Sequence, residues 1–132
     1  MQIRALPGGG LVSSFAPAGT IRSLALSGRV AAVIVRRGAL TQIDAYDPAT
    51  GARVRTVTVP ATATGLSASG TRLVYRTGRR VWVASAVAGG PPPRLLATAA
   101  SVPIGLSIEG TRVAWAENLS SGGRIQAVDV RP

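Results

Sequence analysis

The chain has 132 residues, of which 46% are hydrophobic and 15% are charged. It contains neither Cys nor His, which excludes disulfides, thiol catalysis and zinc sites of the usual kind. Fifteen basic residues, all of them Arg, and five acidic residues give a net charge of +10. This charge favours an anionic partner, although a GC-rich genome that encodes Arg in place of Lys would give the same composition.

The N-terminal segment 2–15 is expected to form a strand pair, because "QIRALPGGGLVSSF" resembles the segment that begins forty residues later at Gln42. The start "MQIRALPGGG" lacks the hydrophobic region of a signal peptide. No apolar run approaches the ~20 residues that span a bilayer, so no membrane span is expected. The compartment stays open: secreted or periplasmic if the true start lies upstream, and otherwise cytoplasmic.

Four short strands are expected next, separated by turn residues. The turn Asp47-Pro48-Ala49-Thr50-Gly51 has a physical basis: the Asp side chain accepts backbone amides, Pro presets φ, and Gly tolerates a positive φ. The same argument assigns a tight turn to Gly28. The strands are Arg22–Leu26, Val30–Val35, Leu40–Tyr46 and Val54–Val59.

The rest of the chain repeats this unit. "GLSASGTRLVYR" from Gly65 recurs as "GLSIEGTRVAWA" from Gly105, and the turn glycines Gly28, Gly70 and Gly110 recur at intervals of 42 and 40 residues. Intervals of this length are typical of repeat architectures, in which each copy is one supersecondary unit. We expect one domain, 1–132, with units at approximately 20–60, 64–99 and 104–132 and the strand pair 2–15 as part of a preceding or closing unit.

Units of about forty residues with four strands are typical of propeller blades. The predicted fold is therefore all-β: a partial β-propeller of about three four-stranded antiparallel blades, the last lacking its fourth strand. The second strand of each blade would face both neighbours, which accounts for the large residues at matched positions, Val33, Tyr75 and Trp115. A β-solenoid is the rival, but its coils are usually shorter.

Two of these segments resemble known bacterial propellers. "IDAYDPATGARVRTVTVP" is similar to the third strand, turn and fourth strand of quinoprotein-like blades, and "GLSASGTRLVYR" is similar to the first hairpin of TolB-type and WD-repeat-like blades. The Gly-His and Trp-Asp signatures of true WD repeats and the Trp pattern of quinone enzymes are absent, so no cofactor is carried over. The resemblance implies that the turns between second and third strands lie on the binding face.

Three blades are fewer than the four to eight that close a ring. Three interpretations follow: a piece of a longer protein, half of a six-bladed ring completed by a homodimer, or an open array. An open array would leave apolar blade faces in water, which disfavours it.

The residues offer little for catalysis, which usually needs His or a tuned carboxylate. Asp44 lies in mid-strand and is expected to point outward without a special role. The loop "ENLSSGG" has oxygens for calcium in Glu117, Asn118, Ser120 and Ser121, but a polar hairpin turn explains it better. We expect a non-enzymatic module with no metal and no cofactor.

The sharpest functional feature is a group of arginines in turns that the resemblance places on one face. A phosphate, sulfate or carboxylate polymer, or an acidic protein patch, is the expected partner. Nucleic acid is not expected, because exposed aromatic residues for stacking are few, with Trp82 the one candidate. The alternative function is a fragment of a larger secreted propeller enzyme or lectin. The candidate anion-binding or partner-binding residues are Arg36, Arg37, Arg76, Arg79 and Arg80.

Overall fold

The structure is a computed structural model that describes residues 2–4, 11–14 and 16–131. These residues form thirteen strands and no helix, and they contain no helix of the length and apolarity that crossing a membrane requires. The strands are β1 (Gln2–Arg4), β2 (Leu11–Ser14), β3 (Thr20–Leu26), β4 (Ala31–Arg37), β5 (Leu40–Tyr46), β6 (Arg53–Val59), β7 (Ala63–Ser69), β8 (Arg72–Thr77), β9 (Arg80–Ser85), β10 (Arg94–Thr98), β11 (Ile104–Glu109), β12 (Arg112–Leu119) and β13 (Gly122–Asp129).

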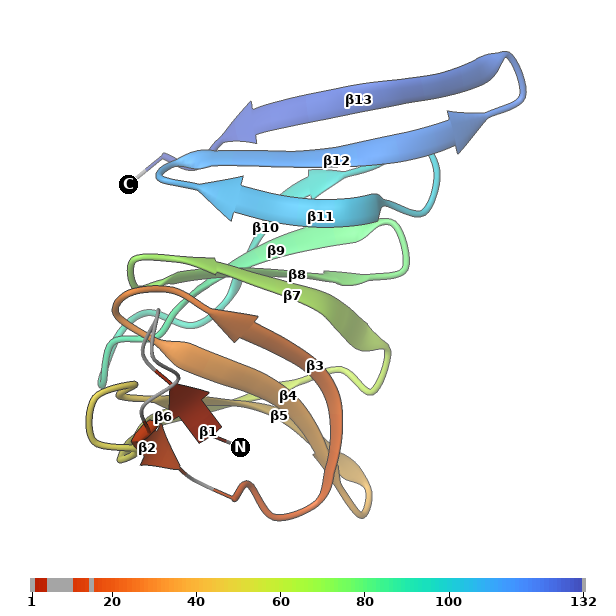
Figure 1. The fold of residues 1–132 in the computed structure, drawn as a ribbon. Coiled ribbons are helices and arrows are strands. Elements are labelled where there is room, and N and C mark those ends of the chain that lie inside the picture. Colours follow the sequence, from red (N-terminus) through yellow and green to blue (C-terminus); the bar gives the residue numbers. More distant parts are fainter. Residues whose placement is uncertain (1, 5–10, 15, 132) are drawn as a thin grey trace.

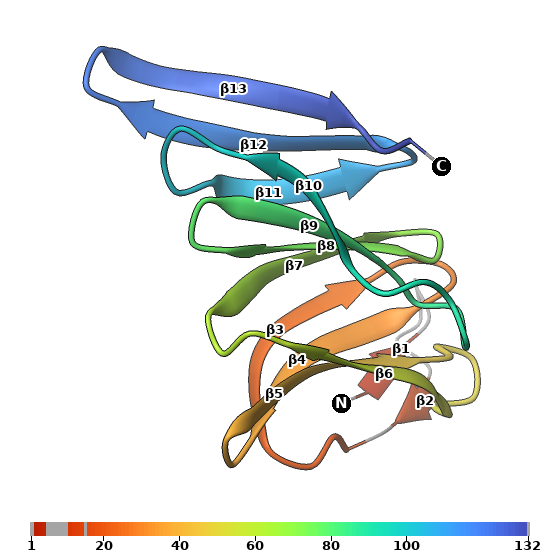
Figure 2. The ribbon, with the colours of Figure 1, turned by 180° about the vertical axis from the view of Figure 1, so that it is seen from behind.

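Antiparallel pairing of neighbouring strands gives a first sheet, β3–β4–β5–β6, a second sheet, β7–β8–β9–β10, and a third sheet, β11–β12–β13. The three sheets stack face to face in chain order (Figure 1 and Figure 2). A two-stranded N-terminal sheet, β1–β2, lies beside the first sheet at the end of the stack away from the third. The all-β prediction is confirmed, and the predicted strands fall within one or two residues of those observed.

The turns show why these segments stop and reverse. Asp47 accepts the Ala49 amide on its Oδ1 at 2.8 Å, and its carbonyl accepts the Gly51 amide at 2.8 Å, with Gly51 at φ 76°. Gly70 also has the expected positive φ, at 58°. Gly28 lies in the predicted tight turn, which the Ser27 amide closes by donating to the Val30 carbonyl at 2.8 Å, but its expected positive φ is wrong. The Ser27 hydroxyl accepts the amides of Arg29 and Val30 in this turn.

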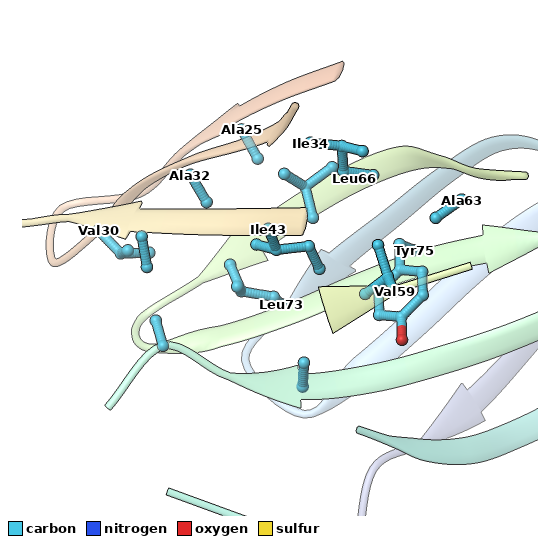
Figure 3. Packing of buried hydrophobic residues seen from close by; sticks show 13 residues of the cluster. Ala25, Val30, Ala32, Ile34, Ile43, Val59, Ala63, Leu66, Leu73 and Tyr75 are labelled. Carbon is cyan, nitrogen blue, oxygen red and sulfur yellow. The ribbon is translucent and has the colours of Figure 1, made fainter. Parts of the chain in front are cut away.

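The largest hydrophobic cluster lies between the first and second sheets. Figure 3 shows Ile43 of β5 facing Leu73 of β8, and Val59 of β6 beside the ring of Tyr75. A second cluster lies between the second and third sheets and includes Trp115, which is 4% exposed. Because alternate residues of a strand point to opposite faces, the second sheet contributes to both clusters.

The matched residues of the second strands all face the preceding sheet. Val33, Tyr75 and Trp115 are at most 4% exposed, as the repeat predicted. The difference between copies appears on the opposite face. In β4 this face is buried, whereas in β12 Ala114 and Ala116 remain half-buried because no described sheet follows the third.

Polar side chains also join neighbouring sheets. The Ser27 hydroxyl donates to the Gly70 carbonyl at 2.6 Å, and the Gly110 amide donates to the Ser69 hydroxyl at 2.9 Å. Both bonds connect the turn after the first strand of one sheet with the same turn of the next. These bonds therefore link equivalent turns of consecutive sheets.

Candidate functional site

The turns that carry the predicted arginines project along one side of the stack, one from each sheet. The β4–β5, β8–β9 and β12–β13 turns lie at the right in Figure 1 and at the left in Figure 2. Arg36 is exposed and donates from Nε to the Gly38 carbonyl at 3.1 Å, within its own turn. Arg76 is half-buried, and its side chain lies against Gly65.

Arg37 has a structural partner. Its guanidinium forms an ion pair with Asp44 at 2.5 Å and donates to Gln42 Oε1 at 2.9 Å. The Asp44 carboxylate also accepts hydrogen bonds from the Thr56 hydroxyl at 3.0 Å and the Tyr46 hydroxyl at 3.3 Å. The expectation that Asp44 is an outward residue without a role is wrong, because its side chain is fully buried.

The electrostatics of this cluster follow from its contacts. Burial by itself raises the pKa of Asp44, but hydrogen bonds from Arg37 and Thr56 and the charges of Arg37 and Arg53 outweigh it, so the pKa lies below its usual value. Burial together with the Asp44 charge raises the pKa of Tyr46. Asp44 is therefore a carboxylate and Arg37 its counterion, which leaves Arg37 little capacity for a ligand.

Arg79 and Arg80 belong to a different environment. They line an open groove between the β8–β9 turn and the β6–β7 connection, together with Pro60, Thr77 and Trp82. Both side chains are exposed, and neither forms an ion pair or hydrogen bond with the described part of the chain. The groove therefore presents, beside an aromatic ring, two guanidinium groups that have no ion-pair or hydrogen-bond partner among the described residues.

Trp82 is anchored beside these arginines. Its indole Nε1 donates to the Thr77 hydroxyl at 2.8 Å, and its ring stacks on Tyr75 with centroids 6.4 Å apart and planes at 10°. Burial raises the pKa of Tyr75 to about 12, so this phenol is neutral at ordinary pH. Trp82 is half-buried, whereas the sequence suggested an exposed ring.

A second buried carboxylate lies in the third sheet. Glu117, 1% exposed, accepts hydrogen bonds from the Trp115 indole at 2.9 Å, the Arg124 guanidinium at 2.8 Å and the Ala100 amide at 3.2 Å. The bonds from Trp115 and Arg124 lower its pKa against the opposing effect of burial. The predicted polar hairpin is confirmed, but Glu117 turns inward from it and does not serve a loop site.

The two carboxylate–arginine pairs share a signal that the sequence interpretation missed. Arg37 and Asp44, like Glu117 and Arg124, are seven residues apart across the hairpin of the second and third strands. Opposite charges at this separation can meet on one face of a hairpin. Among the described residues, no group of three or more acidic or other metal-binding side chains forms a candidate metal site.

Comparisons with known proteins support the fold alone. No protein-family model matches the chain, and no curated protein matches it. Among solved structures, the chain is similar to one described as the crystal structure of the computationally designed Ika4 protein, with 19% identity and a TM-score of 0.63. The match covers 90% of this chain and 72% of that chain.

Proposed function

We propose that the chain is a non-enzymatic interaction module built from three blades of a partial β-propeller, the last without its fourth strand. Its binding element is the groove at the β8–β9 turn, where Arg79 and Arg80 hold the anionic groups of a partner. The partner is an acidic protein segment or another polyanion that carries carboxylate or sulfate groups.

The propeller proposal is supported by the equivalence of the sheets. Corresponding residues face the same way in all three, and a hydrogen bond between equivalent Ser and Gly residues joins the turns of consecutive sheets. The third sheet has three strands where the other two have four. Among the described residues, the first and third sheets lie at opposite ends of the arrangement, which is therefore an open stack (Figure 1).

One observation supports the binding proposal: some arginines have ion-pair or hydrogen-bond partners within the chain, whereas Arg79 and Arg80 have none among the described residues. Arg37 and Arg124 neutralise buried carboxylates, and Arg55 donates to three backbone carbonyls. Arg79 and Arg80 have no such partner among the described residues. Exposed guanidinium groups bind carboxylates, phosphates and sulfates through charge-assisted pairs of hydrogen bonds.

Heparin affinity chromatography tests this proposal. The double variant Arg79→Gln/Arg80→Gln should elute at clearly lower salt than the parent, because two specific contacts are lost. The matched control is Arg29→Gln/Arg53→Gln, which removes the same charge from exposed residues outside the groove. Equal shifts for both variants would mean that the attraction is diffuse, and the groove would not be the binding element.

The outer face of the third sheet favours a second candidate, a fragment of a larger secreted propeller enzyme or lectin. Ile104 and Ile125 are 51% and 80% exposed there, whereas Val74 and Val81 on the corresponding face of the second sheet are buried. Light scattering of the isolated 132-residue protein tests it. Aggregation would support the fragment, a defined species of two chains would support a shared ring, and a stable monomer would count against both.

A further inference from the structure

A second arginine-lined groove lies between the second and third sheets. Its volume is about 360 Å³, within the range of small-molecule sites. Arg72, Arg94 and Arg131 line it, and no carboxylate among the described residues does. Val83 and Val130 form apolar walls. The groove therefore combines positive charge with apolar surface.

The corresponding place between the first and second sheets shows how this groove arises. The strand pairing aligns the two sheets, because the pair Ala31–Tyr46 of the first sheet corresponds to the pair Leu73–Ala84 of the second. Val30 therefore corresponds to Arg72, and Asp47 corresponds to Ser85. Val30, 1% exposed, fills the first interface, whereas Arg72 at the second is exposed. Asp47 lines the first groove, of about 260 Å³, whereas Ser85 lines the second.

The fourth strands supply an internal control for hydrogen bonding. Arg55, which pairs with Ala45 in β5, corresponds to Arg94, which pairs with Val83 in β9. The Arg55 guanidinium donates to the carbonyls of Ser85, Gly90 and Pro91 at 2.7–2.9 Å.

The Arg94 guanidinium has a single described acceptor, the Arg131 carbonyl. Arg94 therefore keeps donors that its counterpart has already used. These donors lie in the groove beside Arg72, whose side chain has no described hydrogen-bond partner. A ligand with two acceptor oxygens fits this arrangement.

We infer that this groove binds a small carboxylate with an apolar body. The guanidinium groups of Arg72 and Arg94 take the carboxylate oxygens, and the Thr71 hydroxyl adds a donor at the same wall. Val83 and Val130 contact the apolar part of the ligand. Carboxylate is favoured over phosphate because apolar walls stabilise an organic body and offer nothing to additional charged oxygens.

Titration of the 132-residue protein with benzoate, followed by methyl NMR, tests the inference. Saturable shifts at the Val83 and Val130 methyl groups are expected. Arg72→Gln and Arg94→Gln should each weaken binding by about tenfold or more, since each removes a charge-assisted contact. Arg72 has no described hydrogen bond to lose, so its variant tests binding without disturbing the fold.

Arg29→Gln is the matched control, because Arg29 lines the corresponding groove of the first interface. It should leave benzoate affinity unchanged, and benzyl alcohol should cause no saturable shift. Absent shifts at Val83 and Val130, or equal weakening by Arg29→Gln, would overturn the site. Inorganic phosphate binding as tightly as benzoate would overturn the assignment to an organic carboxylate.

Discussion

The two interfaces between consecutive sheets bury different kinds of side chain. The first contains aliphatic residues and Tyr75, without a buried charge. The second contains Trp115, whose indole donates to the buried carboxylate of Glu117, which Arg124 neutralises from the partner strand. Both interfaces are formed by equivalent strands of a repeated unit.

This difference shows that the repeat determines which positions lie between the sheets. The residues of each copy determine whether such a position holds an apolar side chain or a polar group with hydrogen-bond partners. A carboxylate is tolerated at such a position only where donors surround it, because an unpaired buried charge is strongly destabilising. At the edges of the interfaces, corresponding positions differ in burial as well. Val30 is buried beside the groove of the first interface, whereas the corresponding Arg72 is exposed and lines the groove of the second.

The largest effect is expected from truncating the aromatic residue of the first interface. Tyr75→Ala should lower the free energy of unfolding by about 3–5 kcal/mol, because it leaves a large cavity in a well-packed cluster. Chemical denaturation measures it. The matched variant Val33→Ala should cost less, and a Tyr75→Ala loss below about 1 kcal/mol would contradict the packing described.

A smaller effect is expected from pH. The pKa values of Asp44 and Glu117 are lowered in the folded protein, so their contribution to stability is present above their unfolded pKa values, about 3.9 and 4.3. That contribution is lost as the pH falls through the lower folded values. Thermal unfolding between pH 7 and pH 2 should show a falling midpoint.

The variant Asp44→Asn/Glu117→Gln provides the control for the pH effect. It should be less stable than the parent at pH 7 because Arg37 and Arg124 lose their counterions. Its midpoint should also change less on acidification, since the two groups no longer titrate. A pH dependence as steep as that of the parent would show that other groups are responsible.

The smallest losses of unfolding free energy are expected from substituting the two equivalent arginines of the fourth strands. Arg55→Gln should cost about 2 kcal/mol because three carbonyls lose a charged donor, whereas Arg94→Gln should cost about 1 kcal/mol or less. Denaturant unfolding of both variants side by side measures the difference. Equal losses would mean that Arg94 is as fully bonded as Arg55, which would also weaken the case for the carboxylate groove.

Local pattern predicted much of the fold. The turn at Asp47 and the positive φ of Gly70 and Gly110 follow from residue chemistry within a few positions, and the repeat aligned Val33, Tyr75 and Trp115. The turn at Gly28 was also predicted, but not its geometry, because the Ser27 hydroxyl accepts two amides there and the turn forms without a positive φ at Gly28.

The candidate sites were less predictable because they depend on contacts between distant segments. Alternation along β5 shows that Asp44 and Ile43 face opposite ways, but it does not show that the side carrying Asp44 is buried. The acceptors of Arg55 are backbone carbonyls at least thirty residues away, which leave no trace in residue types. Arg37 and Arg79 look alike in the sequence, and only their surroundings distinguish a structural arginine from a free one.

The stacking order underlies every site described, and nuclear Overhauser effects between aromatic rings and methyl groups test it directly. We expect contacts from the Tyr75 ring to methyl groups of Ile34 and Val59 in the first sheet, and from the Trp115 indole to methyl groups of Val74 and Val81 in the second. The absence of these contacts, or contacts from both rings to the same sheet, would contradict the stack of equivalent sheets.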